Sequence, residues 1–166
     1  MGCLGLHFSL DAQQVEAIEA IEDEDERVSH VQDEFEEQLW TADPSRAQET
    51  DKAWDGIHRA LTDGSLSWGD GTPLSQAILG GELLYEEDDY ILSLKSPDEV
   101  KQIAAALREV TRERLRAGYD RIDAKSYGGE LSDRDFEYTW TWFEKLVGFY
   151  ERAAAAGRFV LFTADQ

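Results

Sequence analysis

Residues 51–81 read DKAWDGIHRALTDGSLSWGDGTPLSQAILGG, and this stretch decides how the rest of the chain is organised. Its first part is predicted to be a helix, because apolar side chains recur every three or four residues. These are Ala53, Trp54, Ile57 and Leu61. Thr50 or Asp51 is the expected N-cap and Gly64 the expected stop, so the sequence predicts one short amphipathic helix here.

Glycines and a short apolar segment fill the second part of the stretch. Residues 64–72 contain three glycines around Trp68 and predict a turn region. No P-loop lysine follows them, so the pattern does not favour a phosphate site. Pro73 begins a helical turn that ends at Gly80–Gly81, where two adjacent glycines indicate close backbone packing.

Several side chains in and near this stretch are candidates for a small-molecule site. Asp55 lies three residues before His58, so both are expected on one side of the helix. Such a pair could orient an imidazole for general-base work or hold half of a metal site; the alternative is that both residues are structural. A ligand cleft needs aromatic faces and a few polar groups. The candidate ligand-binding residues are Lys52, Trp54, Asp55, His58, Trp68 and Glu82.

The chain before this stretch is predicted to contain a strand and two helices. Residues 3–10 alternate in the manner of a half-buried strand. A capping-box pattern opens a helix over 11–21. The acidic run 22–26 is expected to be an exposed link or a fraying helix end, and the apolar stripe over 28–39 predicts a second helix. Residues 41–49 are polar and are expected to form a loop.

The chain after this stretch is predicted to alternate between strands and longer helices. Residues 90–94 form the clearest second strand. A serine cap, a first-turn proline and a capping-box glutamate then open a helix over 96–110. Residues 119–131 are expected to form an ordered loop, and an aromatic-rich helix follows over 132–157. The apolar run 158–164 is typical of a buried strand.

These elements predict the fold class. The chain has 166 residues, of which 42% are hydrophobic, so it can bury one substantial core. We expect a single α+β domain over 1–166, with a small mixed sheet of about three or more strands packed against five to six helices.

Negative charge limits the partners that the chain can bind. The sequence holds 36 acidic and 16 basic residues, for a formal charge of −20, and residues 1–40 carry twelve of the acids and one base. Such a surface repels phosphate backbones and anionic membranes, so neither nucleic acid nor membrane is an expected partner. A basic protein partner could dock on it, with Glu34, Glu36 and Glu37 as candidate contacts. The alternative is a solvated face that keeps the protein soluble.

Five arginines cluster in the C-terminal half of the sequence. They are Arg108, Arg112, Arg114, Arg116 and Arg121. This group could pair with the acidic N-terminal helices, either within one molecule or between the two copies of a homodimer.

Cysteine and histidine usage argues against a disulfide or a metal centre. Cys3 is the only cysteine, so an intrachain disulfide is impossible and a reducing cytoplasm is the expected compartment. The three histidines and Cys3 show no metal-ligand spacing, so we expect no metal and no cofactor. No apolar run is long enough for a membrane span, and no signal peptide is recognisable.

Five segments of the sequence resemble the YfbM-like family, a family of bacterial proteins of unknown function. They are MGCLGL (1–6), DKAWDGIH (51–58), PLSQAILGG (73–81), SPDEVKQIAAAL (96–107) and FEKLVGFYERAAAAGRFVLF (143–162). The chain departs from the family pattern at Asp55 and over 127–132. The resemblance implies a single α+β domain, and it implies no established activity, catalytic residue or cofactor.

Two functions follow from these observations as hypotheses. The first is a non-enzymatic acidic module that docks a basic partner, as an inhibitor or immunity-type protein does. The second is a small-molecule-binding protein or enzyme with a pocket around Trp54, His58 and Trp68. No catalytic residue can be assigned, because the serines and histidines share no recognised signature.

Overall fold

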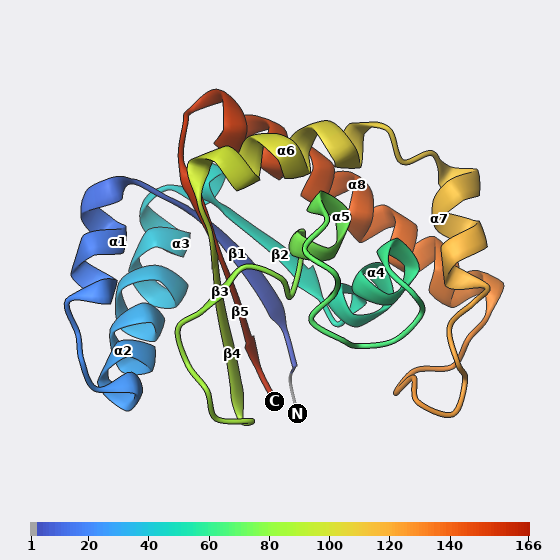
Figure 1. Ribbon diagram of the computed structural model, residues 1–166, viewed down its shortest axis with the longest axis horizontal. Helices are drawn as coiled ribbons and strands as arrows, with labels where there is room; N and C mark the ends of the chain where they lie inside the picture. The colour runs from blue at the N-terminus through green and yellow to red at the C-terminus, as the bar shows by residue number, and fades with distance from the viewer. Residues whose placement is uncertain (1–2) are drawn as a thin grey trace.

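The last strand of the chain, β5, lies in the middle of a five-stranded sheet with the order β2-β1-β5-β4-β3 (Figure 1). The computed structural model describes residues 3–166, and every strand pair in that range is antiparallel. The strands are Gly5–Leu10 (β1), Ala47–Asp51 (β2), Glu82–Leu83 (β3), Tyr90–Lys95 (β4) and Phe159–Asp165 (β5). The backbone N–H of Gln166 donates to Asp89 O at 2.9 Å, which ties down the end of β5.

Helices cover both faces of this sheet. The first layer consists of α1 (Ala12–Glu19), α2 (Glu24–Val31), the π-helical η1 (Gln32–Leu39) and α3 (Trp40–Ala42), and the 3-10 turn η2 (Pro44–Arg46) leads from it into β2. The second layer consists of α4 (Ala53–Leu61), α5 (Pro73–Gln76), α6 (Pro97–Arg108), α7 (Arg112–Tyr119) and α8 (Asp133–Ala155). Figure 1 shows α1, α2 and α3 on one side of the strands and α4 to α8 on the other.

Each layer encloses its own hydrophobic core against the sheet. Along β5, Val160, Phe162 and Ala164 belong to the core under α4–α8, whereas Leu161 belongs to the core under α1–η1. This alternation follows from the two-residue period of a strand. Because both faces are covered, β5 reads as a continuous apolar run, as the sequence predicted for a buried strand.

The predicted helix caps are present. Asp11 accepts a hydrogen bond from the Gln14 backbone, and the Gln14 side chain accepts one from the Asp11 backbone, so the capping box of α1 is complete. Ser96 and Glu99 form the same arrangement at the start of α6, with Pro97 at its first position. Ser132 caps α8. These side chains satisfy backbone N–H groups that have no partner within the helix.

The α+β architecture is confirmed, but two parts of the fold prediction are wrong. The sheet is antiparallel and not mixed, because all four strand pairs run in opposite directions and none has the crossover that joins parallel neighbours. Residues 3–166 also contain eight α-helical segments, more than the five to six expected. The additional ones are the short α3 and the helix α7, which Thr111 caps.

Two predicted irregular segments are ordered elements. Residues 22–26 are not only a link, since the Asp23 side chain caps α2 at 3.0 Å from the Glu26 nitrogen. Acidic side chains fill the first turn of α2, where the helix dipole favours negative charge. The predicted loop over 41–49 contains η2 and the start of β2, an edge strand in which only Ala47 and Thr50 are buried. Its sequence therefore lacks an apolar pattern.

Three of the five clustered arginines pair with acids of their own layer. Arg116 bonds Asp120 and Asp133, each at 2.9 Å, and Arg112 pairs with Glu137. Arg108 approaches Glu151 at 3.2 Å. The predicted pairing with the N-terminal acids within one molecule is therefore wrong, because helices α7 and α8 supply nearer carboxylates.

Candidate functional site

A pocket of about 520 Å³ opens where the first turn of α4, the first half of α8 and the loop before α8 meet. We call it the α4–α8 pocket. It is lined by Cys3, Lys52, Trp54, Asp55, Leu66, Tyr127, Gly128, Gly129, Asp135, Tyr138 and Gln166. Three of the six predicted ligand-binding residues, Lys52, Trp54 and Asp55, therefore lie together in one pocket.

The start of α4 is fixed by a tyrosine of α8. Asp51 has a backbone φ of 46°, in the left-handed region that Asp tolerates better than most residues. The Tyr138 hydroxyl donates to Asp51 Oδ2 at 2.7 Å and accepts from the Lys52 backbone N–H at 3.2 Å. Asp51 is thus not the N-cap that the sequence predicted, because Lys52 takes that position without a side-chain cap bond.

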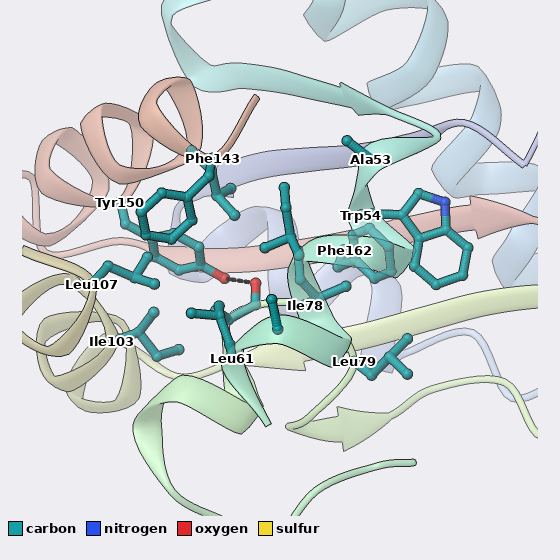
Figure 2. Close-up of a cluster of buried hydrophobic side chains, with 14 of the residues drawn as sticks. Ala53, Trp54, Leu61, Ile78, Leu79, Ile103, Leu107, Phe143, Tyr150 and Phe162 are labelled. Atoms are coloured by element: carbon teal, nitrogen blue, oxygen red, sulfur yellow. Dashed lines mark hydrogen bonds between the residues drawn. The ribbon is translucent and has the colours of Figure 1, made fainter. Parts of the chain in front are cut away.

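Trp54 forms the floor of the pocket. Its indole Nε1–H donates to Cys3 O at 2.7 Å, and its ring lies 5.7 Å from that of Phe162 on β5. Figure 2 shows the two rings side by side. A Cβ at Gly5 would lie 2.7 Å from the Trp54 ring, so glycine is needed there for β1 to approach the indole. The floor is therefore apolar and rigidly held.

Asp55 pairs with Arg59, one turn further along α4. Arg59 Nε donates to Asp55 Oδ1 at 2.5 Å, and the same guanidinium donates to Ser126 Oγ at 2.9 Å and to Ser126 O at 3.1 Å. Its Cζ lies 5.8 Å from the ring centre of Tyr127. This nearly buried arginine therefore fixes the loop that carries Tyr127 and the two glycines against the pocket.

His58 does not line the α4–α8 pocket. Its side chain is completely buried, with Nε2 at 2.5 Å from Ser67 O and Nδ1 without a hydrogen-bond partner among residues 3–166. Burial lowers the pKa of His58 below its ordinary value, so the ring is neutral near pH 7. No hydrogen bond of the described residues joins Asp55 to His58; each uses another partner.

Asp135 organises the opposite wall. Its Oδ2 accepts hydrogen bonds from Tyr119 at 2.6 Å and from Tyr127 at 2.9 Å. Burial, together with the Asp135 carboxylate, raises the pKa of Tyr127 well above its usual value. Tyr127 therefore stays a hydrogen-bond donor at neutral pH, and it is unsuited to accepting a proton.

A second, smaller hollow of about 280 Å³ adjoins this pocket along the outer edge of the sheet. We call it the β4-edge pocket. It is lined by Leu66, Trp68, Leu79, Leu83, Tyr85, Glu86, Glu87, Asp88, Tyr90, Ile91 and Gln166. Trp68 is 49% exposed and Leu83 40% exposed, so two large apolar side chains of this pocket are accessible to solvent. The predicted residue Trp68 lies here, and Glu82 lies on the exposed β3 outside both pockets.

The Gly80–Gly81 segment is packed closely, as the sequence predicted. Gly81 has φ 124°, and a Cβ there would lie 2.5 Å from Leu94 O. Beneath this segment, Lys95 is completely buried and donates to Ile78 O and Ser93 Oγ, each at 2.6 Å. Figure 2 shows the Tyr150 hydroxyl donating to the neighbouring carbonyl of Ala77, at 2.7 Å. The buried side chains of Lys95 on β4 and Tyr150 on α8 therefore hold the 73–81 segment in place.

The three candidate acids of the partner-docking hypothesis separate in the structure. Glu36 turns toward the sheet, where its Oε1 accepts from Tyr90 at 2.5 Å and from Thr163 at 2.9 Å. Glu34 and Glu37 are exposed. Only the latter two present their carboxylates to solvent.

Residues 3–166 contain neither a metal-binding cluster nor a helix able to span a membrane. In that range no group of three or more His, Cys, Asp and Glu side chains is arranged to hold a metal ion. No helix of the same range combines the length and apolarity needed to cross a membrane.

The sequence predicted only three of the eleven residues that line the α4–α8 pocket. Cys3, Leu66, Tyr127, Asp135 and Tyr138 come from four separate parts of the chain, and no local pattern joins them to α4. One signal was present, since Asp135 and Tyr138 are three residues apart and so lie on one face of α8.

Comparisons with known proteins agree with this fold. A family model described as a domain of unknown function, DUF1877, matches residues 1–163. The crystal structure of YfbM from Escherichia coli, titled a protein of unknown function, is similar with a TM-score of 0.71 and 24% sequence identity, over 97% of this chain and 99% of that one. No curated protein matches the chain. The resemblance expected from the sequence is confirmed, and the chain belongs to the DUF1877 family of YfbM-like proteins.

Proposed function

We propose that the protein binds a small molecule in the α4–α8 pocket. The observation that carries this proposal is the joining of an apolar floor to polar side chains whose positions are already fixed by hydrogen bonds. Trp54 is held by Cys3, Asp55 by Arg59, and Tyr127 by Asp135. A preformed pocket of this size with a few convergent polar groups is the usual form of a ligand site.

Binding is favoured over acid–base catalysis. The tyrosine of the far wall keeps its proton because burial and Asp135 raise its pKa. His58, the predicted base, is buried, lies outside the pocket lining and is hydrogen-bonded to Ser67. A general base has to reach the proton that it removes, and His58 has no exposed surface.

Cys3 provides a direct test, because it is the only cysteine of the chain and lines the pocket. The rate at which Ellman's reagent modifies Cys3 should be measured with a panel of amines, carboxylates, phosphates and sugars. A ligand that fills the pocket is expected to slow the reaction several-fold and to saturate. Asp135→Asn should weaken that protection, whereas Glu37→Gln on the distant η1 should leave it unchanged.

The proposal fails if no compound of the panel protects Cys3 while the folded protein still reacts at a measurable rate. It also fails if protection is equally weakened by Asp135→Asn and Glu37→Gln. In that case the compounds act through the net charge of the protein and do not occupy the pocket.

A second candidate function is docking of a basic protein partner. It is supported by an acidic surface larger than the sequence suggested, since the Glu86 backbone N–H donates to Glu24 Oε2 at 3.2 Å and so brings the 86–89 loop beside α2. Affinity capture at low and moderate salt tests it. A genuine partner is expected to be lost on Glu34→Lys together with Glu37→Lys, and a partner indifferent to both changes would contradict docking at this face.

A further inference from the structure

The two pockets described above share part of their lining, and we call them together the cleft. Leu66 and Gln166 line both of them. The α4–α8 pocket holds its polar groups at α4 and α8, and the β4-edge pocket ends at the loop before β4. A ligand that spans both pockets would pass Leu66 and Gln166.

Carboxylates stand at both ends of this cleft. Asp55 and Asp135 line the α4–α8 pocket, and Glu86, Glu87 and Asp88 line the β4-edge pocket. Against these five acids stand two cationic side chains, the exposed Lys52 of the lining and Arg59, which pairs with Asp55 from outside the lining. The cleft therefore attracts positive charge, and the formal charge of −20 strengthens this field.

The inner carboxylates retain an oxygen for a ligand. Arg59 binds Asp55 at Oδ1, and both tyrosines bind Asp135 at Oδ2. Within residues 3–166, no hydrogen bond engages Asp55 Oδ2 or Asp135 Oδ1. Each of these groups can accept a charge-assisted hydrogen bond without breaking the network that positions it.

The part of the cleft next to Leu66 contains apolar side chains. Trp68, Leu79 and Leu83 line the β4-edge pocket together with Leu66. Methylene groups can bury themselves against such side chains, and the exposed face of Trp68 can also contact a cation. A sugar or a phosphate would leave its polar groups unpaired or repelled here.

We infer that the ligand is a linear polyamine, a methylene chain with two or more protonated amines, with one amine between Asp55 and Asp135 and another beside the 86–88 loop. This inference rests on the small-molecule-binding function proposed above. The methylenes between the amines then cross Leu66 and contact Trp68. The two amines then pair with the carboxylates that line the two pockets.

The test compares spermidine with butylamine, which has one amine, by isothermal titration calorimetry. The unmodified protein is expected to bind one spermidine about tenfold or more tightly than butylamine. Asp135→Asn should weaken both ligands. Glu87→Gln with Asp88→Asn should weaken spermidine several-fold and leave butylamine unchanged. Glu34→Gln with Glu37→Gln, which removes the same charge elsewhere, should change neither affinity by more than about twofold.

Three results would overturn the inference. Equal losses in the 87/88 and 34/37 variants would mean diffuse attraction to the acidic surface. Equal affinity for spermidine and butylamine would mean a site for a single amine. A trilysine peptide that displaces spermidine and binds more tightly would identify a peptide site.

The Cys3 assay separates this inference from the proposed function. If a ligand of another class protects Cys3 and spermidine does not, the polyamine inference is wrong and the binding pocket stands. If no ligand of any class protects Cys3, both are wrong.

Discussion

Lysine is normally charged, yet the side chain of Lys95 is completely buried. Its amine bonds only neutral oxygens, those of Ile78 and Ser93, and burial lowers the pKa of Lys95 well below its ordinary value. The Lys95 amine therefore lowers the free energy of unfolding, because it is protonated easily in the unfolded chain and not in the native state.

We expect Lys95→Met to leave the protein as stable or to stabilise it by about 1 kcal/mol at pH 7. The folded pKa lies below the unfolded one, so the penalty of wild-type Lys95 grows as the pH falls from about 10 toward 7. Urea unfolding at pH 9 and pH 7 checks this. A variant that is destabilised at both values would show that the two hydrogen bonds outweigh the cost of burial.

His7 makes stability depend on pH in the acidic range. Burial, and next the neighbouring Lys95, lowers the pKa of His7 from 6.5 to about 3. The unfolded chain therefore binds a proton below pH 6.5 that the native state does not bind until about pH 3.

The contribution of neutral His7 is thus complete above pH 6.5 and is lost progressively as the pH falls toward 3. At pH 5 the loss is about 2 kcal/mol. Free energies of unfolding measured at pH 7 and pH 5 for wild type and His7→Gln should show a steeper fall in the wild type. Parallel curves would contradict the burial of a neutral ring.

For single residues, the sequence predicted which side chains are candidates for a site, but it did not predict which partners they bind. Asp55 has His58 three residues on and Arg59 four residues on, and both spacings place side chains on one face of a helix. Asp55 pairs with Arg59 and not with His58, because Ser126 and Tyr127 of a distant loop hold the Arg59 guanidinium in place. Glu36 likewise looked like its exposed neighbours until Tyr90 and Thr163 were placed opposite it.

Among the elements, α7 shows most clearly what a local pattern misses. It has the low apolar content of RERLRAGY, and only Leu115, Gly118 and Tyr119 of its residues are buried. Gly118 weakens helix propensity, yet it lets α7 approach the backbone of α4. A Cβ at Gly118 would lie 1.9 Å from Ala60 O, a distance that requires the helices to separate.

Gly118→Ala is therefore expected to destabilise the protein by about 3 kcal/mol, in spite of the better helix propensity of alanine. Gly128→Ala is the matched control, because a Cβ there meets nothing within 4 Å. It should change the free energy of unfolding by less than about 0.5 kcal/mol. Thermal unfolding of both variants decides the matter; similar melting temperatures would contradict the close packing of α4 and α7.

Elements with complete local signals were predicted well. The capping boxes of α1 and α6 indicate those helices in the sequence, because the residues that form each cap lie within a few positions of one another. The edge strand β2 has no such signal. It is defined by its backbone pairing with β1, and its polar side chains resemble those of a loop.

For the whole molecule, the central claim is that ligand binding belongs to the cleft beside α4 and not to the acidic helices on the other face of the sheet. The five tryptophans of the chain report on both places. Trp54 lines the α4–α8 pocket, Trp68 lines the β4-edge pocket, and Trp40 lies on α3 in the acidic layer. Trp140 and Trp142 on α8 line neither pocket and serve as internal controls.

The most direct measurement is a proton–nitrogen correlation spectrum of the five indole N–H groups during a titration with spermidine. We predict that the Trp54 and Trp68 resonances shift together and saturate at one equivalent, while those of Trp40, Trp140 and Trp142 keep their positions. A shift confined to Trp40, or equal small shifts of all five resonances without saturation, would contradict the claim.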